Sequence, residues 1–173
     1  AVNDEAWSSY QHLVNVARDG SAIELGSLQA LPFTVPHDAR EPLQFVFASG
    51  KRRLGLLTDA GEITRHIRDM LSGIDGLVLE CNHDADMLAA SDYPPSLRRR
   101  IGGRFGHLEN SAAADLLRDI DVSRLQHLVA AHLSERNNHP ALAVSALATA
   151  LGCAAERIGV ACQEAGFDWR QVD

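Results

Sequence analysis

The sequence has little of what marks secreted, membrane-embedded or disulfide-stabilised proteins. Its three cysteines, Cys81, Cys153 and Cys162, are scattered and form no Cys-x-x-Cys pair, which argues against a disulfide framework and favours a reducing cytosol. Apolar runs are broken within a few residues, far short of the roughly 20 that span a bilayer. The first residues have neither the basic start nor the apolar stretch of a signal peptide. We therefore expect a cytoplasmic protein without membrane contacts.

The sequence also has fewer basic than acidic residues, 16 against 23. A formal net charge of −7 excludes a globally basic nucleic-acid binder, although local contacts to phosphate remain compatible with it. The 173 residues, of which 46% are hydrophobic, are enough for one domain with its own core, and we expect a single α/β domain over residues 1–173. No initiating methionine precedes Ala1, so we expect the chain to be part of a larger protein.

Hydrophobic periodicity predicts alternating strands and helices. Strands are expected at 23–25, 28–35, 43–48, 53–58, 77–79, 125–133 and 157–162, with a hairpin around Gly50. Helices are expected from an Asp4 cap to about residue 17, after Gly61, over 84–90, over 97–101 with a Ser96 cap, after an Asn110 cap, and from Pro140 to a Gly152 stop. This succession predicts one α/β unit.

Several apolar runs end on a side chain that can ionise or bind metal. Asp59 follows the run before Gly61, Glu80 follows Leu77–Leu79, and His132 ends Leu128–Ala131. Open α/β sheets bind ligands at the carboxyl ends of their strands, so these residues predict one site assembled from several strands.

Two imidazoles and one carboxylate, from His37, Asp59 and His132, suit a borderline metal such as zinc. Each residue also has an ordinary interpretation. His37, in a proline-flanked loop, can be a surface histidine, Asp59 can cap the following helix, and His132 can be structural.

Glu80 and His107 form a second candidate pair. A carboxylate at the end of a strand can orient an imidazole and raise its proton affinity, which gives a general acid beside a metal. Alternatively, Glu80 caps the helix near Asp84 and His107 packs in a glycine turn.

A basic run precedes His107. Such a cluster is often only a solvated helix face, but planar guanidinium groups match phosphate geometry, which favours phosphodiester binding at Arg98, Arg99, Arg100 and Arg104.

Taken together, these segments resemble the C-terminal half of metallo-β-lactamase-fold hydrolases of the YycJ-like (VicX-like) branch, which are similar to exonucleases. The resemblance covers roughly residues 31–151. It implies an α/β fold of the αββα sandwich type, here as a C-terminal half with one sheet flanked by helices. The most specific strings are Leu57–Gly61, Leu79–Asp84, Tyr93-Pro94, Leu97–Ile101, Gly106–Asn110 and Ala131–Asn138.

The resemblance also implies roles for individual residues. His37 and His132 would each bind one of two divalent ions, zinc or alternatively manganese, and Asp59 would bridge both. By a more distant similarity to the ribonuclease Z group, Glu80 and His107 would serve the leaving group. The implied reaction is hydrolysis of a phosphodiester, with DNA as the substrate.

One hallmark of the family is missing. Its His-x-His-x-Asp-His loop would supply most ligands of both metals, yet no His-x-His occurs among the eight histidines. We expect that loop on a missing N-terminal half, and we expect this chain alone to be inactive and to bind metal poorly. The alternatives are a degenerate family member, a hydrolase of small-molecule esters, thioesters or lactams, and a non-catalytic interaction module.

Overall fold

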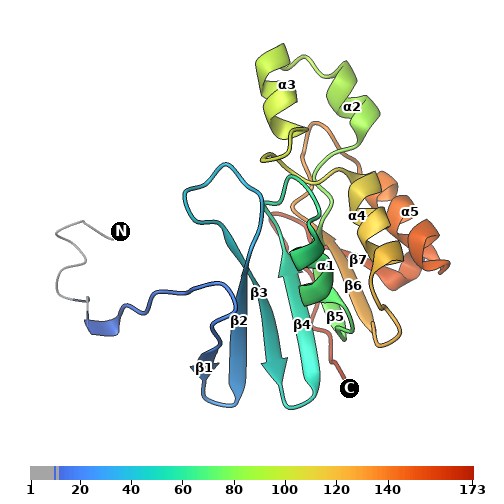
Figure 1. Ribbon diagram of the computed structural model, residues 1–173. Helices are drawn as coiled ribbons and strands as arrows, with labels where there is room; N and C mark the ends of the chain where they lie inside the picture. The colour runs from blue at the N-terminus through green and yellow to red at the C-terminus, as the bar shows by residue number, and fades with distance from the viewer. Residues whose placement is uncertain (1–9, 11) are drawn as a thin grey trace.

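The computed structural model describes residue 10 and residues 12–173, and they form one α/β unit around a mixed sheet (Figure 1). The seven strands lie side by side in chain order. They are β1 (Ile23–Leu25), β2 (Leu28–Thr34), β3 (Leu43–Ser49), β4 (Arg52–Leu57), β5 (Gly76–Glu80), β6 (His127–Ala131) and β7 (Ile158–Val160). Pairs from β1 to β4 are antiparallel, and pairs from β4 to β7 are parallel.

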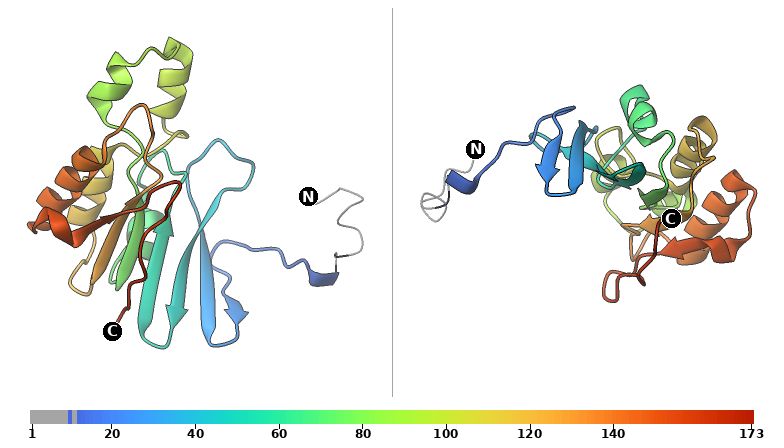
Figure 2. Two further views of the ribbon diagram at one scale, coloured as in Figure 1. Left: turned by 180° about the vertical axis from the view of Figure 1, so that it is seen from behind. Right: turned by 90° about the horizontal axis from the view of Figure 1, so that it is seen from below.

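Within the described residues, five α-helices accompany the sheet: α1 (Arg65–Leu71), α2 (Ala85–Ala90), α3 (Pro95–Ile101), α4 (Asn110–Asp119) and α5 (Pro140–Leu151). Helices α1, α4 and α5 pack against one face, whereas α2 and α3 project beyond the end of the sheet (Figures 1 and 2). In the described part of the chain, no helix is long and apolar enough to cross a membrane.

The core lies between the sheet and α1, α4 and α5. Alternate strand residues face these helices, because successive side chains of a strand point to opposite faces. Leu57, Leu77 and Leu79 are fully buried there, together with Ile67 and Leu71 of α1. Buried apolar residues recur about every 3.6 positions in the helices and every second position in the strands. This spacing therefore determines which face of each helix packs on the sheet.

The opposite face of the sheet has no helix on it among the described residues. By the strand register, Phe45, Phe47, Leu54 and Val78 point to this face, and the two phenylalanine rings stack with centroids 5.9 Å apart. Only the C-terminal segment 167–172 crosses part of it (Figure 2). The structure thus has one covered and one largely uncovered sheet face.

Most expected elements are confirmed, and three details are wrong. Residues 14–18 have no regular secondary structure, so the helix expected from Asp4 to residue 17 is not formed there, while Asp4 itself lies outside the described residues. Leu13, Val14 and Val16 are exposed, so the apolar stripe has nothing to pack on, and short helices depend on such packing.

The other two corrections concern helix caps. Helix α3 begins at Pro95, whose fixed φ suits the first helical position, so Ser96 lies within the helix and does not cap it. Glu109, not Asn110, is the N-cap residue of α4, and the Asn110 side chain instead exchanges two hydrogen bonds of 2.9 Å with Asn138.

At the edge of the sheet far from the strand ends discussed below, the buried Asp75 holds three segments together. Its carboxylate accepts hydrogen bonds from the Arg53 N–H at 2.8 Å, from Arg52 Nη1 at 3.1 Å and from Arg124 Nη2 at 2.9 and 3.0 Å. Burial alone raises the pKa of the Asp75 carboxyl, but these hydrogen bonds outweigh it and the pKa lies below its ordinary value. The ionised form is therefore the one that stabilises the fold.

We expect Asp75→Asn to lower the free energy of unfolding by roughly 1–3 kcal/mol near neutral pH, because charged hydrogen bonds are lost. The loss should shrink in acid: a lowered folded-state pKa gives stability above about pH 4 that disappears as the pH falls through that pKa. Urea unfolding at several pH values measures both effects. The exposed Asp69→Asn is the control, and equal stability of the two variants would contradict the assignment.

Candidate functional site

The strand directions bring the predicted site residues to one edge. Strand β2 is antiparallel to β3 and β3 to β4, so β2 runs the same way as β4, β5 and β6. Their carboxyl ends therefore lie at one edge of the sheet, where His37, Asp59, Glu80 and His132 follow or end them. His107 arrives from the loop between α3 and α4. The sequence prediction of one site at several strand ends matches this arrangement.

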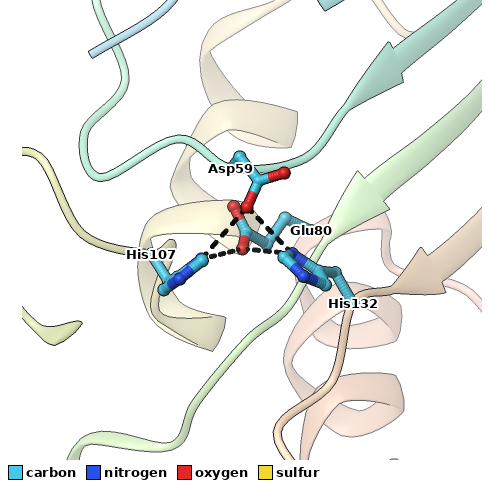
Figure 3. Close-up of side chains that lie close together, drawn as sticks. All are labelled: Asp59, Glu80, His107 and His132. Carbon is cyan, nitrogen blue, oxygen red and sulfur yellow. Dashed lines mark hydrogen bonds and ion pairs between the residues drawn. The ribbon is translucent and has the colours of Figure 1, made fainter. Parts of the chain in front are cut away.

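Glu80 is the buried centre of the cluster (Figure 3). Its Oε1 accepts hydrogen bonds from Nδ1 of His107 and from Nδ1 of His132, both at 2.9 Å. Its Oε2 accepts the backbone N–H of Ala60, also at 2.9 Å. Asp84, not Glu80, caps α2, so the alternative capping role of Glu80 is not observed. The hydrogen bonds of Glu80 therefore connect the end of β5 to the segments that follow β4 and β6 and to the loop before α4.

These contacts set the charge of the cluster. Burial alone raises the pKa of the Glu80 carboxyl, but the hydrogen bonds from His107, His132 and the Ala60 N–H outweigh it, so the pKa lies below its ordinary value. The hydrogen bond to Glu80 raises the pKa of His132, against the opposing effect of burial. With Nδ1–H donated to Glu80, each imidazole has its Nε2 left for a ligand or a reacting group.

Asp59 is the half-buried carboxylate of the cluster and is more accessible than Glu80. Its Oδ1 lies 3.7 Å from Nδ1 of His107, 3.7 Å from Nε2 of His37 and 3.8 Å from Nδ1 of His132. The cap of α1 is Thr64, so Asp59 does not serve as that helix cap. The Asp59 carboxylate therefore lies within about 4 Å of a ring nitrogen of three histidines.

The backbone is strained at this point. Among the described residues, Asp59 and His132 are the only non-glycine positions with positive φ, at 52° and 57°. Such conformations are unfavourable for residues with a Cβ and persist where the surroundings impose them, often at functional sites. Asn82 imposes one of them: its Nδ2 donates to the His132 carbonyl at 2.9 Å, and its own carbonyl accepts the Ser134 N–H at 2.8 Å.

His37 approaches from the other side. Its Nδ1 donates to the Gly106 carbonyl at 3.0 Å, because a carbonyl only accepts, and its Nε2 lies 3.7 Å from Asp59 Oδ1 and 3.6 Å from Asp38 Oδ1. Gly106 has no room for a side chain, since a Cβ there would lie 2.1 Å from the Ile101 carbonyl oxygen. The His107 ring lies between the other two, with centroids 5.3 Å from His37 and 5.2 Å from His132.

The donor set suits a divalent metal. One ligand atom from each of Asp59, Glu80, His107 and His132 lies within 4.8 Å of the others. Carboxylate oxygens and imidazole nitrogens are the ligands preferred by zinc and manganese. This group shares Asp59 and His132 with the predicted ligand set, adds Glu80 and His107, and has His37 beside it rather than in it.

A cavity of about 260 Å³ opens beside the cluster, lined by His37, Asp38, Asp59, Leu97, Arg100, Ile101, Gly106 and His107. Arg100 Nε donates to Asp38 Oδ2 at 2.5 Å, and this hydrogen bond lowers the pKa of the Asp38 carboxyl. The mouth of the site therefore carries an arginine whose charge is already paired.

The other predicted arginines differ from one another. Arg104 Nε donates to Glu62 Oε1 at 2.7 Å, and Arg98 donates to the backbone carbonyl of Ala89. Arg99 is exposed and has no ion pair or side-chain hydrogen bond within the described residues. The run at 98–104 is thus not one uniform basic surface.

Two contributors were missed by the sequence reasoning. Asn82, which fixes the His132 backbone, and Asp38, which pairs with Arg100, received no role, although both stand within three residues of predicted site residues. Polar residues next to a strand-end ligand are the signal that could have identified them.

Comparison with known proteins agrees with the geometry. The sequence model of the β-lactamase superfamily domain matches residues 3–132. Exodeoxyribonuclease YycJ of Bacillus anthracis is 34% identical over 149 residues, which are 82% of this chain and 56% of that protein. Exodeoxyribonuclease WalJ of Streptococcus pneumoniae serotype 2 (strain D39 / NCTC 7466) is 29% identical over 153 residues, 88% of this chain and 56% of that protein.

Solved structures share the fold. The metallo-β-lactamase fold protein YhfI of Bacillus subtilis superposes with a TM-score of 0.65 at 14% identity, over 96% of this chain and 62% of that one. Zn²⁺-bound PqqB of Methylobacterium extorquens superposes with a TM-score of 0.60 at 20% identity, over 84% of this chain and 52% of that one.

The chain spans about half the length of the curated relatives that it matches. A superfamily match over most of the chain, a relative at 34% identity, and carboxylates and imidazoles gathered at the strand ends point the same way. The chain therefore belongs to the β-lactamase superfamily and has the metallo-β-lactamase fold of the YycJ-like branch.

Proposed function

We propose that this chain supplies part of the active site of a metal-dependent phosphodiesterase that acts on DNA as an exonuclease. The observation that carries the proposal is the buried Glu80 carboxylate, which holds His107 and His132 beside the half-buried Asp59. Arg100 stands at the mouth of this site, and the relatives of highest identity described above are named exodeoxyribonucleases.

Asp59, His132 and His37 would hold two divalent ions, zinc or alternatively manganese. Bound there, the ions would supply a nucleophile at neutral pH and neutralise charge that develops on the phosphate. Glu80 orients His132, and its three hydrogen bonds hold the loops at the strand ends next to one another. It acts as a positioning residue, because it is buried away from any substrate.

His107 would be the general acid. When both ring nitrogens are protonated, Nδ1–H is held by Glu80 and the second proton is on Nε2. Nε2 would then pass its proton to the departing oxygen of the phosphodiester. The Glu80 carboxylate stabilises the charged imidazole before the transfer and fixes its orientation.

The uncovered sheet face is the place we propose for the rest of the fold. Phe45, Phe47, Leu54 and Val78 leave an apolar surface on which no described helix packs, and exposed patches of this kind mark interaction surfaces. Since the aligned part covers only 56% of either relative, we propose an upstream half that packs there and supplies the remaining metal ligands.

Replacing Asp59 by Ala in the protein that includes this upstream half should abolish turnover, because a carboxylate that would hold the ions is lost. The measurement is cleavage of an end-labelled DNA oligonucleotide. Asp69→Ala, on the exposed side of α1, is the matched control and should cleave normally. Near-normal cleavage by the Asp59 variant would rule out the two-metal assignment.

His107→Gln separates a general acid from a metal ligand, because both roles fit the position of the ring. As a general acid, His107 can be lost with a fall in kcat of about 10²–10⁴-fold while the metal content stays unchanged. Cleavage rates and elemental mass spectrometry on the same preparation measure the two quantities. If the variant loses an equivalent of metal, His107 is a ligand and the proton comes from elsewhere.

A further inference from the structure

A second hollow, separate from the metal site, lies between α2 and α3. Its volume is about 410 Å³, and it is lined by His83, Ala85, Leu88, Ala89, Pro95, Arg98, Arg99, Gly102 and Glu109. Residues 97, 100 and 101 of α3 line the cavity at the metal site, whereas residues 98, 99 and 102 line this one. At 100° per residue these two sets face opposite sides of the helix, so α3 separates the two hollows.

His83 is the unusual residue in this hollow. Its residue surface is only 2% exposed, and the buried ring nitrogen Nδ1 has no hydrogen-bond partner within residues 12–173, while Nε2 is directed toward Gly102. Buried polar side chains are normally hydrogen-bonded, so an imidazole without a partner at the wall of a hollow indicates that a ligand completes it. Burial lowers the pKa of His83, so the ring is neutral near neutral pH and offers one N–H.

The charge of the hollow favours an anion. Arg99 has no paired acid, and Arg98 uses one N–H on the Ala89 carbonyl, which leaves most of its five donors free. Glu109 is the one acid in the lining, and its Oε1 already accepts the Ser111 hydroxyl. In contrast, Arg100 and Arg104 are paired with Asp38 and Glu62. The free positive charge of the run therefore lies on the His83 side of α3.

Gly102 keeps His83 accessible. A Cβ at this position would lie 3.8 Å from His83 Nε2 and 3.3 Å from a methyl of Leu88. The backbone of Gly102 has φ −82°, which any residue can adopt, so nothing in its conformation requires glycine. A side chain there would stand over the imidazole edge, and its absence leaves Nε2 open to the hollow.

We propose that this hollow is a phosphate-binding subsite, in which His83 Nε2–H, Arg98 and Arg99 bind a phosphate of the same DNA strand whose scissile phosphodiester lies at the metal site. The inference rests on the proposed function for its substrate, but the subsite itself consists of different residues. Because α3 is about 10 Å across, the phosphate in this subsite and the phosphodiester at the metal site are separated by roughly that distance.

Binding is tested first without catalysis, by titrating this chain with inorganic phosphate and following the histidine ring resonances by NMR. His83 should shift in a saturable manner, while His139, which is exposed and outside the hollow, should stay in place. Gly102→Ala should abolish the His83 shift without removing any charge, and Arg99→Ala should weaken it about tenfold, the loss expected for one charged hydrogen bond. Unchanged melting temperatures show that both variants are folded.

The second test uses the protein with its upstream half and DNA oligonucleotides of increasing length. KM should fall once the substrate is long enough to place one phosphate at the metal site and another in the subsite, and Arg98→Ala/Arg99→Ala should remove this dependence of KM on length. The slope of log affinity against log salt should fall by about 1. Arg65→Ala/Arg118→Ala, on exposed faces of α1 and α4, is the charge-matched control.

The two hypotheses fail in different ways. If phosphate moves no His83 resonance but DNA is still cleaved with metal, the subsite is wrong and the proposed function stands. If His83 binds phosphate but no DNA is cleaved, the nuclease assignment is wrong. Shifts that are equal in the Gly102→Ala and wild-type chains would place the phosphate elsewhere and overturn the subsite.

Discussion

The hydrogen bonds of one buried carboxylate determine the arrangement of the whole site. Glu80 has no contact with solvent, and it accepts N–H groups from His107, His132 and Ala60, which come from three separate segments. An ionised carboxylate without partners would be very unfavourable in this position, so the surrounding loops must converge on it. The same bonds fix both imidazoles in the tautomer that leaves Nε2 free. Fold stability and site geometry therefore depend on the same group.

The sheet topology makes this convergence achievable. Four of the strands that run in the same direction, β2, β4, β5 and β6, are followed or ended by site residues at one edge, and short loops then suffice to bring these side chains together. The strained backbones of Asp59 and His132 are tolerated because neighbouring groups hold them, as Asn82 does for His132. At the far edge, Asp75 performs the equivalent structural task with arginines and no chemistry. Ligand sites at the carboxyl ends of the strands are common in open α/β folds.

The sequence alone predicted the strands, because their apolar runs and the Gly50 and Gly152 turns are local signals. It also predicted that Asp59, Glu80 and His132 share an edge, since each follows a run of this kind. It did not predict that residues 14–18 would lack a helix. The periodicity of apolar residues does not reveal whether another part of the protein is available for them to pack against. Pairings such as Arg100 with Asp38 and Arg104 with Glu62 join residues more than 40 positions apart, and spacing in the sequence does not encode them.

The central claim is that this chain carries part of a dinuclear metal site whose other ligands come from an upstream half. Metal content measured by elemental mass spectrometry tests it most directly, on this chain and on a version extended upstream. We predict two equivalents of zinc or manganese in the extended protein and little in this chain alone. No bound metal in either protein would contradict the account and would leave a member of the fold family without metal chemistry.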